Sequence, residues 1–215
     1  MKKVLLFLAD GFETYEASVF IDVIGWNQVD GDGSTQLFSC GLRREIKSSF
    51  NQRFIVDYLV DEIDTTEFDA LVIPGGFEEY NYFEDAYDER FLKLIRKFNA
   101  QSKLIASVCV GALAIARSDV LINRRATTYN KNIVRQKELE SYTVNVINQP
   151  IVSDCNVITS WNPSTAPDVA FLVLERLTSK EQSNRIKEIM GFKQILSDNV
   201  RQKWSQQSHW YHKSN

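Results

Sequence analysis

An α/β fold with a mostly parallel central sheet is predicted for this chain of 215 residues by three observations. Short, wholly apolar runs recur along the sequence, and segments with helical spacing of apolar residues fill several of the gaps between them. No internal repeat, low-complexity segment or shift in composition divides the chain. Hydrophobic residues make up 44% of it, which is enough to fill one sizeable core. A single α/β domain is therefore expected.

Buried strands are predicted where apolar residues follow one another without a polar interruption. These runs are residues 4–9, 37–40, 70–73, 104–108 and 157–159. The first run follows Met-Lys-Lys and mimics a secretory leader. Asp10 and Gly11 end it after six residues, so we interpret it as a first strand.

Helices are predicted from apolar residues spaced three and four positions apart. They cover about residues 14–26, residues 85–99, and a segment that follows a turn and cap at 162–165 and ends near residue 177. Residues 47–60 contain two short strand-like stretches and are interpreted as a β-hairpin at the sheet edge. The single domain is expected to cover residues 1–178, and residues 179–215 a C-terminal helical extension and polar tail.

Charge and cysteine content narrow the choice of partners. The net charge is −3 and no Lys/Arg block is present, so neither a nucleic acid nor a membrane partner is expected. The chain has three cysteines, Cys40, Cys109 and Cys155, which is an odd number, and none lies close to another in the sequence. This favours a reducing compartment and a cytoplasmic location. The two histidines, His209 and His212, lie in the last seven residues, so no metal and no other cofactor is expected.

Cys109 lies where the predicted strand at 104–108 meets a helix that begins immediately after it. A side chain at such a corner is lifted off the sheet, and the small residues Gly111 and Ala112 let the helix pass close to the turn. The N–H groups and the positive dipole end of the helix favour the thiolate, which predicts a pKa below the ordinary value of about 8.5. The alternative is an inert cysteine on a core strand. The abrupt change from strand to helix favours a reactive one.

Residues that follow other strands are expected to meet Cys109, because the carboxyl ends of parallel strands line one crevice. Glu16 lies just beyond the first strand, and Gly75 and Gly76 follow the third. The two glycines leave backbone N–H groups uncovered, as an oxyanion-binding loop requires, although a plain turn is the alternative. Glu16 is predicted to share one proton with Cys109, because burial and a thiolate both raise a carboxyl pKa. The alternative is a surface carboxylate that complements the helix dipole.

Four segments, taken together, form a more specific pattern than any one of them. In chain order they are residues 4–16, 70–76, 107–111 and 159–166. With this order and spacing the chain resembles the ThiJ/PfpI superfamily, the group that includes the Parkinson-associated deglycase. The resemblance covers residues 2–178. It implies a flavodoxin-like three-layer sandwich of the class I glutamine amidotransferase type, usually present as a homodimer.

The resemblance also implies roles for particular residues. Cys109 matches the nucleophile of the family, and Glu16 matches the carboxylic acid that hydrogen-bonds to it. Gly76 and the N–H of Val110 match the donors that bind an oxyanion.

Two positions depart from the family pattern. Members that pair the cysteine with a histidine carry it after Thr-Thr, but here Tyr129 follows Thr127 and Thr128. A phenol with an ordinary pKa of about 10 donates a hydrogen bond but is a poor proton shuttle at neutral pH. Trp161 stands where the branch containing the deglycase has an arginine, so the cationic side chain that would bind an anionic substrate is missing there. These departures argue against protease, amidotransferase and fast glyoxalase activity.

The expected function is chemistry of a reactive cysteine on small electrophiles such as reactive carbonyls or peroxide, with Cys109 and Glu16 as the catalytic pair. The residues expected to bind the oxyanion or the substrate are Gly75, Gly76, Val110 and Tyr129. The alternative is a non-catalytic redox-sensing or binding module, which lacks turnover. A third interpretation, cysteine-dependent hydrolysis of amide or peptide bonds, rests on family names more than on these residues. The expected partners are a small electrophile and a second copy of the chain.

Overall fold

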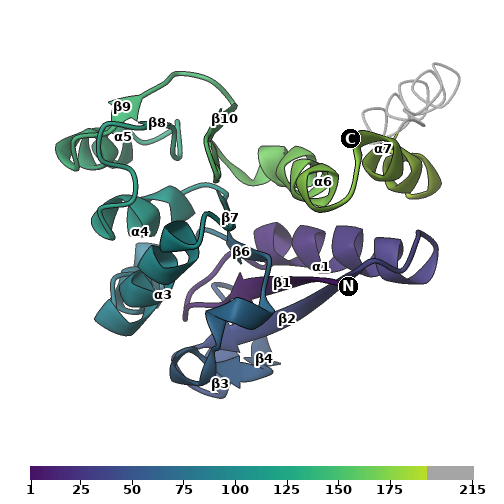
Figure 1. Ribbon diagram of the computed structural model, residues 1–215. Helices are drawn as coiled ribbons and strands as arrows, with labels where there is room; N and C mark the ends of the chain where they lie inside the picture. Colours follow the sequence, from purple (N-terminus) through teal and green to yellow (C-terminus); the bar gives the residue numbers. More distant parts are fainter. Residues whose placement is uncertain (193–215) are drawn as a thin grey trace, which may run out of the picture.

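The computed structural model describes residues 1–192, and in this part of the chain a seven-stranded sheet lies between two groups of helices (Figure 1). The strands, in spatial order, are β10 (Ile151–Asp154), β11 (Val157–Ser160), β7 (Leu104–Ser107), β6 (Ala70–Ile73), β1 (Lys2–Phe7), β2 (Thr35–Gly41) and β5 (Tyr58–Leu59). Every pairing is parallel except β10 with β11. The order β2-β1-β6-β7-β11 is that of flavodoxin-like folds, so the predicted fold class is confirmed.

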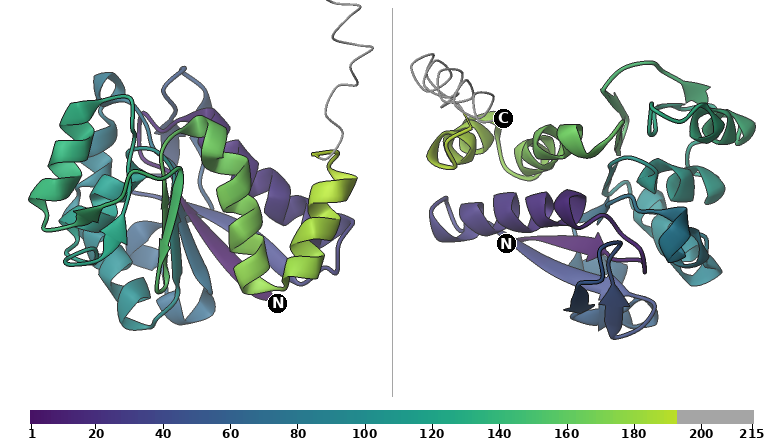
Figure 2. Two further views of the ribbon diagram at one scale, coloured as in Figure 1. Left: turned by 90° about the horizontal axis from the view of Figure 1, so that it is seen from above. Right: turned by 180° about the vertical axis from the view of Figure 1, so that it is seen from behind.

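Helices cover both faces of the sheet, as Figure 2 shows from two further directions. One face carries α1 (Thr14–Val29), α6 (Ala166–Leu177) and α7 (Lys180–Ile189). The other carries α3 (Glu89–Ala100), preceded by α2 (Tyr82–Ala86), and α4 (Gly111–Arg117) and α5 (Ile133–Ser141). A small parallel pair, β8 (Arg125–Ala126) and β9 (Asn145–Val146), lies beside α5.

The apolar runs of the sequence are strands that are buried on both faces. All four residues of β6 are fully buried, and so are the last four of β1. Burial of a side chain of this size stabilises the fold by about 1.5–3 kcal/mol. Helices on both sides leave no solvent-facing position along these strands, so their sequences do not alternate between polar and apolar residues.

The helix predicted at residues 85–99 is two helices, α2 and α3. Asp88 lies between them with extended backbone, and its carboxylate accepts a hydrogen bond from the N–H of Arg90 at 2.9 Å. This cap starts α3 after the chain has turned. Asp85 belongs to α2, and its buried carboxylate accepts two hydrogen bonds from the guanidinium of Arg43, at 2.7 and 2.8 Å. Apolar spacing predicted the buried face of α3 but not the break before it.

In the structure, the hairpin predicted at residues 47–60 covers fewer residues and begins before residue 47. β3 (Glu45–Lys47) and β4 (Arg53–Ile55) form an antiparallel pair outside the central sheet. β5 leaves this hairpin and pairs in parallel with β2. The helix predicted at 14–26 is α1, which continues to Val29.

The end of the described chain packs onto the helices before it. Ile186 of α7 is buried, and the side-chain amide of Gln182 donates to Asn27 of α1 at 2.6 Å. The remainder of the predicted extension and the polar tail, residues 193–215, lie outside the described residues. Within residues 1–192, no helix combines the length and the apolar character needed to cross a membrane.

Candidate active site

Cys109 occupies the turn between β7 and α4 with a backbone φ of 56°, in the left-handed region. A non-glycine residue held in this region costs about 1–3 kcal/mol, and such strain is typical of a nucleophile elbow. The last hydrogen bond from this segment to the neighbouring strand β6 is donated by the N–H of Val108 to the carbonyl oxygen of Ile73, at 3.1 Å. A Cβ on Gly111 would lie 2.7 Å from that carbonyl oxygen, so only glycine lets α4 pass β6 this closely. The structure therefore puts Cys109 at the corner that the sequence predicts.

Glu16 comes from the first turn of α1 and is fully buried. Its Oε2 accepts a hydrogen bond from the N–H of Gly75 at 2.6 Å, and its carboxyl lines the same cavity as the Cys109 thiol. Burial raises the pKa of Glu16 from 4.5 to about 8, although the Gly75 N–H opposes this, and the charge of Glu13 adds to it. At neutral pH this carboxyl holds its proton. The alternative of a surface carboxylate is excluded by the burial.

The pKa of Cys109 departs from the expectation of a helix N-terminus. Burial, the largest influence, and an ionised Glu16 both raise the pKa of the thiol, whereas the N–H of Val110 lowers it. The predicted low pKa is therefore wrong as an effect of the helix alone, because one amide of a short helix does not offset desolvation. When Glu16 keeps its proton, the repulsion is removed and a donor faces the sulfur. Thiol and carboxyl then behave as one coupled acid that shares a proton.

Gly75 positions the carboxyl and is not an oxyanion donor, which corrects the role predicted for it. Its N–H is already bonded to Glu16. A Cβ at this position would lie 2.8 Å from Cβ of Cys109 and 3.0 Å from both Oε2 of Glu16 and the nitrogen of Val110. The absence of a side chain is what lets the carboxyl and the thiol approach each other.

Two other backbone N–H groups belong to residues near Cys109, and that of Val110 interacts with its sulfur. Among residues 1–192, neither Gly76 nor Val110 donates its N–H to an oxygen of the chain, and both residues line a cavity above Cys109. Gly76 is held in a bridge opposite Phe12, and a Cβ on it would lie 2.2 Å from the ring of Tyr82. Preorganised donors of this kind stabilise a negative oxygen that develops next to a nucleophile.

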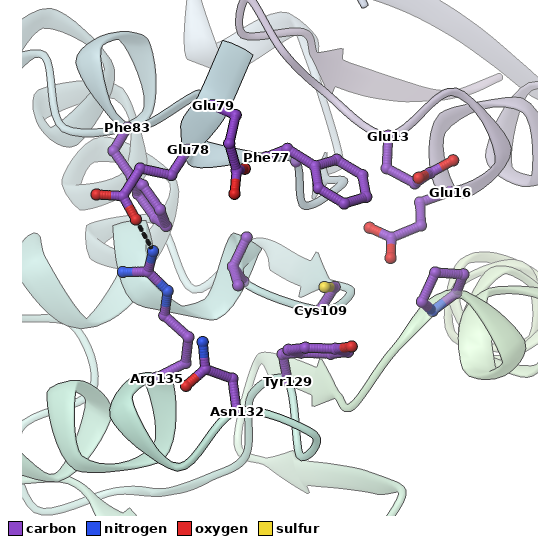
Figure 3. Close-up of a pocket in the computed structure, with 13 residues that line it drawn as sticks. Glu13, Glu16, Phe77, Glu78, Glu79, Phe83, Cys109, Tyr129, Asn132 and Arg135 are labelled. Atoms are coloured by element: carbon purple, nitrogen blue, oxygen red, sulfur yellow. Dashed lines mark hydrogen bonds and ion pairs between the residues drawn. The ribbon is translucent and has the colours of Figure 1, made fainter. Parts of the chain in front are cut away.

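The cavity has a volume of about 250 Å³, and Cys109 lies in the middle of the side chains that line it (Figure 3). Tyr129 forms part of its wall, where the sequence predicts it. The loop that carries it is fixed at Cys109, because the hydroxyl of Thr128 donates to the Cys109 carbonyl at 2.9 Å. The side-chain amide of Gln136 donates to the carbonyls of Thr128 and Tyr129, at 2.7 and 3.1 Å.

Trp161 does not line this cavity, although it follows β11 at the same edge of the sheet. Its indole Nε1 is buried and has no acceptor among the described residues. Pro163, two residues further along, forms that part of the wall. Compared with the deglycase branch of the family, Trp161 therefore replaces an arginine and adds no other polar group to the cavity.

Several residues at the mouth were not predicted from the sequence. They are Glu13, Phe77, Glu78, Glu79, Phe83, Asn132 and Arg135. The first four lie in the loops after β1 and β6, so the rule that led to Glu16 and Gly76 could have found them. Arg135 comes from α5 and Phe83 from α2, and no motif in the sequence connects either residue to Cys109.

No metal centre is found in the described part of the chain, since no three His, Cys, Asp or Glu side chains there are grouped to hold an ion. His209 and His212 lie outside residues 1–192.

A flavodoxin-like sheet with a strained cysteine at a strand-to-helix corner, beside a buried carboxyl, defines a class of cysteine-elbow α/β proteins. The chain belongs to the DJ-1/PfpI family, because the model of that family matches residues 2–176. This confirms the family that the four sequence segments predicted.

Relatives from three organisms show the range of similarity. Protein dj-1beta of Drosophila melanogaster is 26% identical over 189 residues, which cover 86% of this chain and 94% of the relative. A deglycase of Thermococcus kodakarensis is 27% identical over 161 residues, or 75% of this chain and 90% of the relative. Protein DJ-1 homolog B of Arabidopsis thaliana is 24% identical over 184 residues, which cover 84% of this chain. This chain spans only 39% of the length of that plant protein.

The crystal structure of Drosophila melanogaster DJ-1beta has the same fold. It superposes with a TM-score of 0.77 at 24% sequence identity, and the match covers 88% of this chain and 97% of that one. At this identity the likeness concerns the fold only.

Proposed function

We propose that Cys109 and Glu16 form a reactive pair that acts on small electrophiles, with reactive carbonyl compounds as the main substrates. The observation that carries this proposal is a buried carboxyl of pKa about 8 next to an elbow cysteine. The cavity above the sulfur and the N–H groups of Gly76 and Val110 support it. A deglycase among the relatives supports carbonyl chemistry as well.

The proposed step is addition of the thiol across a carbonyl group. A bond forms between the sulfur of Cys109 and the carbonyl carbon, and the π electrons of the carbonyl move onto its oxygen. Gly76 and Val110 donate hydrogen bonds to that oxygen while it carries charge. The proton of the thiol ends on the oxygen, and Glu16 relays it. The product is a hemithioacetal. With a dicarbonyl such as glyoxal, a proton shift from its carbon to the neighbouring carbonyl gives a thioester, which water hydrolyses to glycolate and the free thiol, so the sequence consumes neither an external oxidant nor a reductant.

A redox-sensing role is the second candidate. Oε1 of Glu16 is buried and has no hydrogen-bond partner among the described residues. A neutral carboxyl there can donate to an oxygen on the sulfur. Peroxide supplies that oxygen and leaves as water, which converts the thiol to a sulfenic acid. A sensor of this kind reacts once per chain, whereas an enzyme turns over.

Amide hydrolysis receives less support. Expulsion of an amine requires a group that protonates it, which in cysteine hydrolases is a histidine. Tyr129 occupies the corresponding position here, next to Thr128. A phenol is a weak acid and base at neutral pH.

The test is glyoxal consumption by the wild type, Cys109→Ala and Cys155→Ser. We expect Cys109→Ala to fall to the rate without protein and Cys155→Ser to keep the wild-type rate. A wild-type rate no greater than that of Cys109→Ala contradicts an enzyme. One equivalent of peroxide, followed by mass spectrometry of Cys109, then decides for or against the sensor.

We also propose that the chain acts in the cytoplasm as a homodimer. The three cysteines are all free, which is typical of a reducing compartment, and the family resemblance implies the dimer. Light scattering of the full chain should give twice the mass of one chain, and cell fractionation should recover the protein with cytoplasmic markers. A monomer at micromolar concentration contradicts the dimer.

A further inference from the structure

The cavity wall above Cys109 carries more carboxyl groups than cationic groups. Its charged residues among the described part of the chain are Glu13, Glu16, Glu78, Glu79 and Arg135. The guanidinium of Arg135 binds the carboxylate of Glu78 and also that of Glu138, at 2.9 Å in the second case. Its guanidinium carbon lies 4.4 Å from the ring centre of Phe83. Figure 3 shows the two side chains next to each other. The positive charge of Arg135 is therefore neutralised within the protein before any ligand enters.

Glu13 and Glu79 are without a cationic partner among residues 1–192. The carboxylate of Glu13 accepts a hydrogen bond only from the N–H of Tyr15, at 3.1 Å, as the cap of α1. Its charge reaches the reacting groups, because it raises the pKa of both Glu16 and Cys109. A positive group bound here would compensate this charge, whereas a negative group would add to it.

Aromatic rings lie on opposite sides of the sulfur. Phe77 enters from the loop after β6 and Tyr129 from the loop after β8, with Cys109 between them (Figure 3). The faces of aromatic rings attract cations, and quaternary ammonium groups most characteristically. Glu16 provides a separate sign that the cavity takes a polar ligand, because it is fully buried and its Oε1 has no partner among the described residues.

We propose that this cavity selects electrophiles that carry a positive charge, namely small aldehydes that bear an ammonium group. The inference rests on the proposed function, since it takes Cys109 as the reacting group. The ammonium group lies between the Phe77 and Tyr129 rings, near the Glu13 and Glu79 carboxylates, and the carbonyl carbon faces the sulfur. Anionic electrophiles of the same size are repelled.

Two thiol reagents of similar size and opposite charge, with a smaller neutral one for reference, test this selectivity directly. The probes are methanethiosulfonates with a trimethylammonium-ethyl, a methyl or a sulfonatoethyl group, applied to the full chain with Cys155→Ser. The rate of Cys109 modification is measured by mass spectrometry and divided by the rate with a flexible cysteine peptide. We expect the cationic reagent to exceed the anionic one by about tenfold after this correction. The preference should shrink in high salt.

Matched variants identify the groups responsible. Glu13→Gln and Glu79→Gln should each lower the ratio of cationic to anionic rates about threefold, while Glu188→Gln on α7 should leave it unchanged. Each ratio is measured within one protein, so a difference in folding between variants cancels. The rate with the neutral reagent reports an intact site.

The possible outcomes separate this inference from the proposed function. Equal corrected rates for the cationic and anionic reagents, with normal modification by the neutral one, overturn the charge selectivity and leave the reactive cysteine standing. Failure of all three reagents at Cys109 overturns the proposed function instead. Reversible adduct formation supplies a second readout: trimethylammonioacetaldehyde should protect Cys109 from the neutral reagent at a lower concentration than glyoxylate does.

Discussion

Two cysteine–carboxyl pairs in this chain have the same chemical groups and opposite electrostatics. Cys109 and Glu16 come from segments far apart in the sequence and meet in a buried site. Cys155 and Asp154 are neighbours in the exposed turn between β10 and β11, where the thiol donates to the carboxylate at 3.3 Å. Both cysteines have a left-handed backbone, with φ of 56° and 52°.

The two carboxyl groups have pKa values that move in opposite directions. Burial raises the pKa of Glu16 to about 8. The pKa of Asp154 is lowered, first by the N–H of Arg125 and then by the Cys155 thiol. At neutral pH Glu16 therefore holds a proton that it can give to sulfur, whereas the ionised Asp154 raises the pKa of Cys155. A nearby carboxyl favours a thiolate only when burial keeps that carboxyl protonated.

The largest expected effect concerns stability and tests whether Glu16 is neutral. Its folded-state pKa of about 8 lies above the unfolded value of 4.5, so its contribution is fully present below pH 4.5 and is lost as the pH rises through 8. Compared with Glu16→Gln, the wild type should lose on the order of 3 kcal/mol in unfolding free energy between pH 5 and pH 8.

Urea unfolding at several pH values measures this difference. Glu188→Gln is the matched control, because it removes an exposed carboxylate on α7 and should follow the wild type at every pH. A constant difference between wild type and Glu16→Gln means that Glu16 is ionised in the folded state, and the contrast between the two pairs then disappears.

The second prediction concerns the rate at which Cys109 reacts. Glu16→Leu keeps the site filled but removes the acid, so alkylation by iodoacetamide at neutral pH should slow by about a hundredfold, and the apparent thiol pKa should rise. Glu16→Gln, which can still donate a hydrogen bond, should be milder. Labelling is followed across pH in a Cys155→Ser background, where the exposed thiol does not compete. Superimposable pH profiles for the leucine variant and its parent would falsify the coupling.

A smaller effect is expected from Tyr129→Phe. Tyr129 lines the cavity and can orient a bound carbonyl, but a phenol does not readily accept a proton near pH 7. Loss of one neutral hydrogen bond of about 1 kcal/mol slows a Cys109-dependent reaction by roughly fivefold. Steady-state kinetics with glyoxal measures this. A loss beyond about a hundredfold with normal Cys109 alkylation means that the phenol is a working catalytic group.

The smallest effect is expected at the exposed pair. Asp154→Asn removes the charge that raises the pKa of Cys155, so alkylation of Cys155 at pH 7.5 should speed up by about threefold, a modest factor because solvent screens the pair. The measurement uses Cys109→Ala so that one accessible thiol remains. A slower reaction means that the carboxylate assists Cys155, and that burial is not what distinguishes the two pairs.

The features that the sequence determined by itself are local in origin. A strand that is covered on both faces has a continuous apolar run, as at residues 70–73. A helix that follows the strand directly changes the spacing of the apolar residues. The corner at Cys109 is visible for this reason, and so are the loops that bring Glu16 and Gly76 to the same edge of the sheet. The position of Tyr129 was implied only by the family resemblance, because it follows β8, which is outside the central sheet. The order of strands in a parallel sheet makes such loops converge without any knowledge of side-chain positions.

Only the tertiary structure decided which group does what at that edge. Gly75 and Gly76 are identical neighbours in the sequence, yet the N–H of Gly75 binds Glu16, whereas the N–H of Gly76 has no acceptor among the described residues and Gly76 lines the cavity. The pKa of Glu16 and the failure of the helix N-terminus to lower that of Cys109 follow from burial, which depends on packing by residues distant in the chain. Arg135, neutralised at the cavity mouth by Glu78 and Glu138, is likewise a product of long-range contacts. Backbone direction and periodicity are short-range properties that a sequence displays, whereas desolvation and charge pairing arise only once distant segments meet.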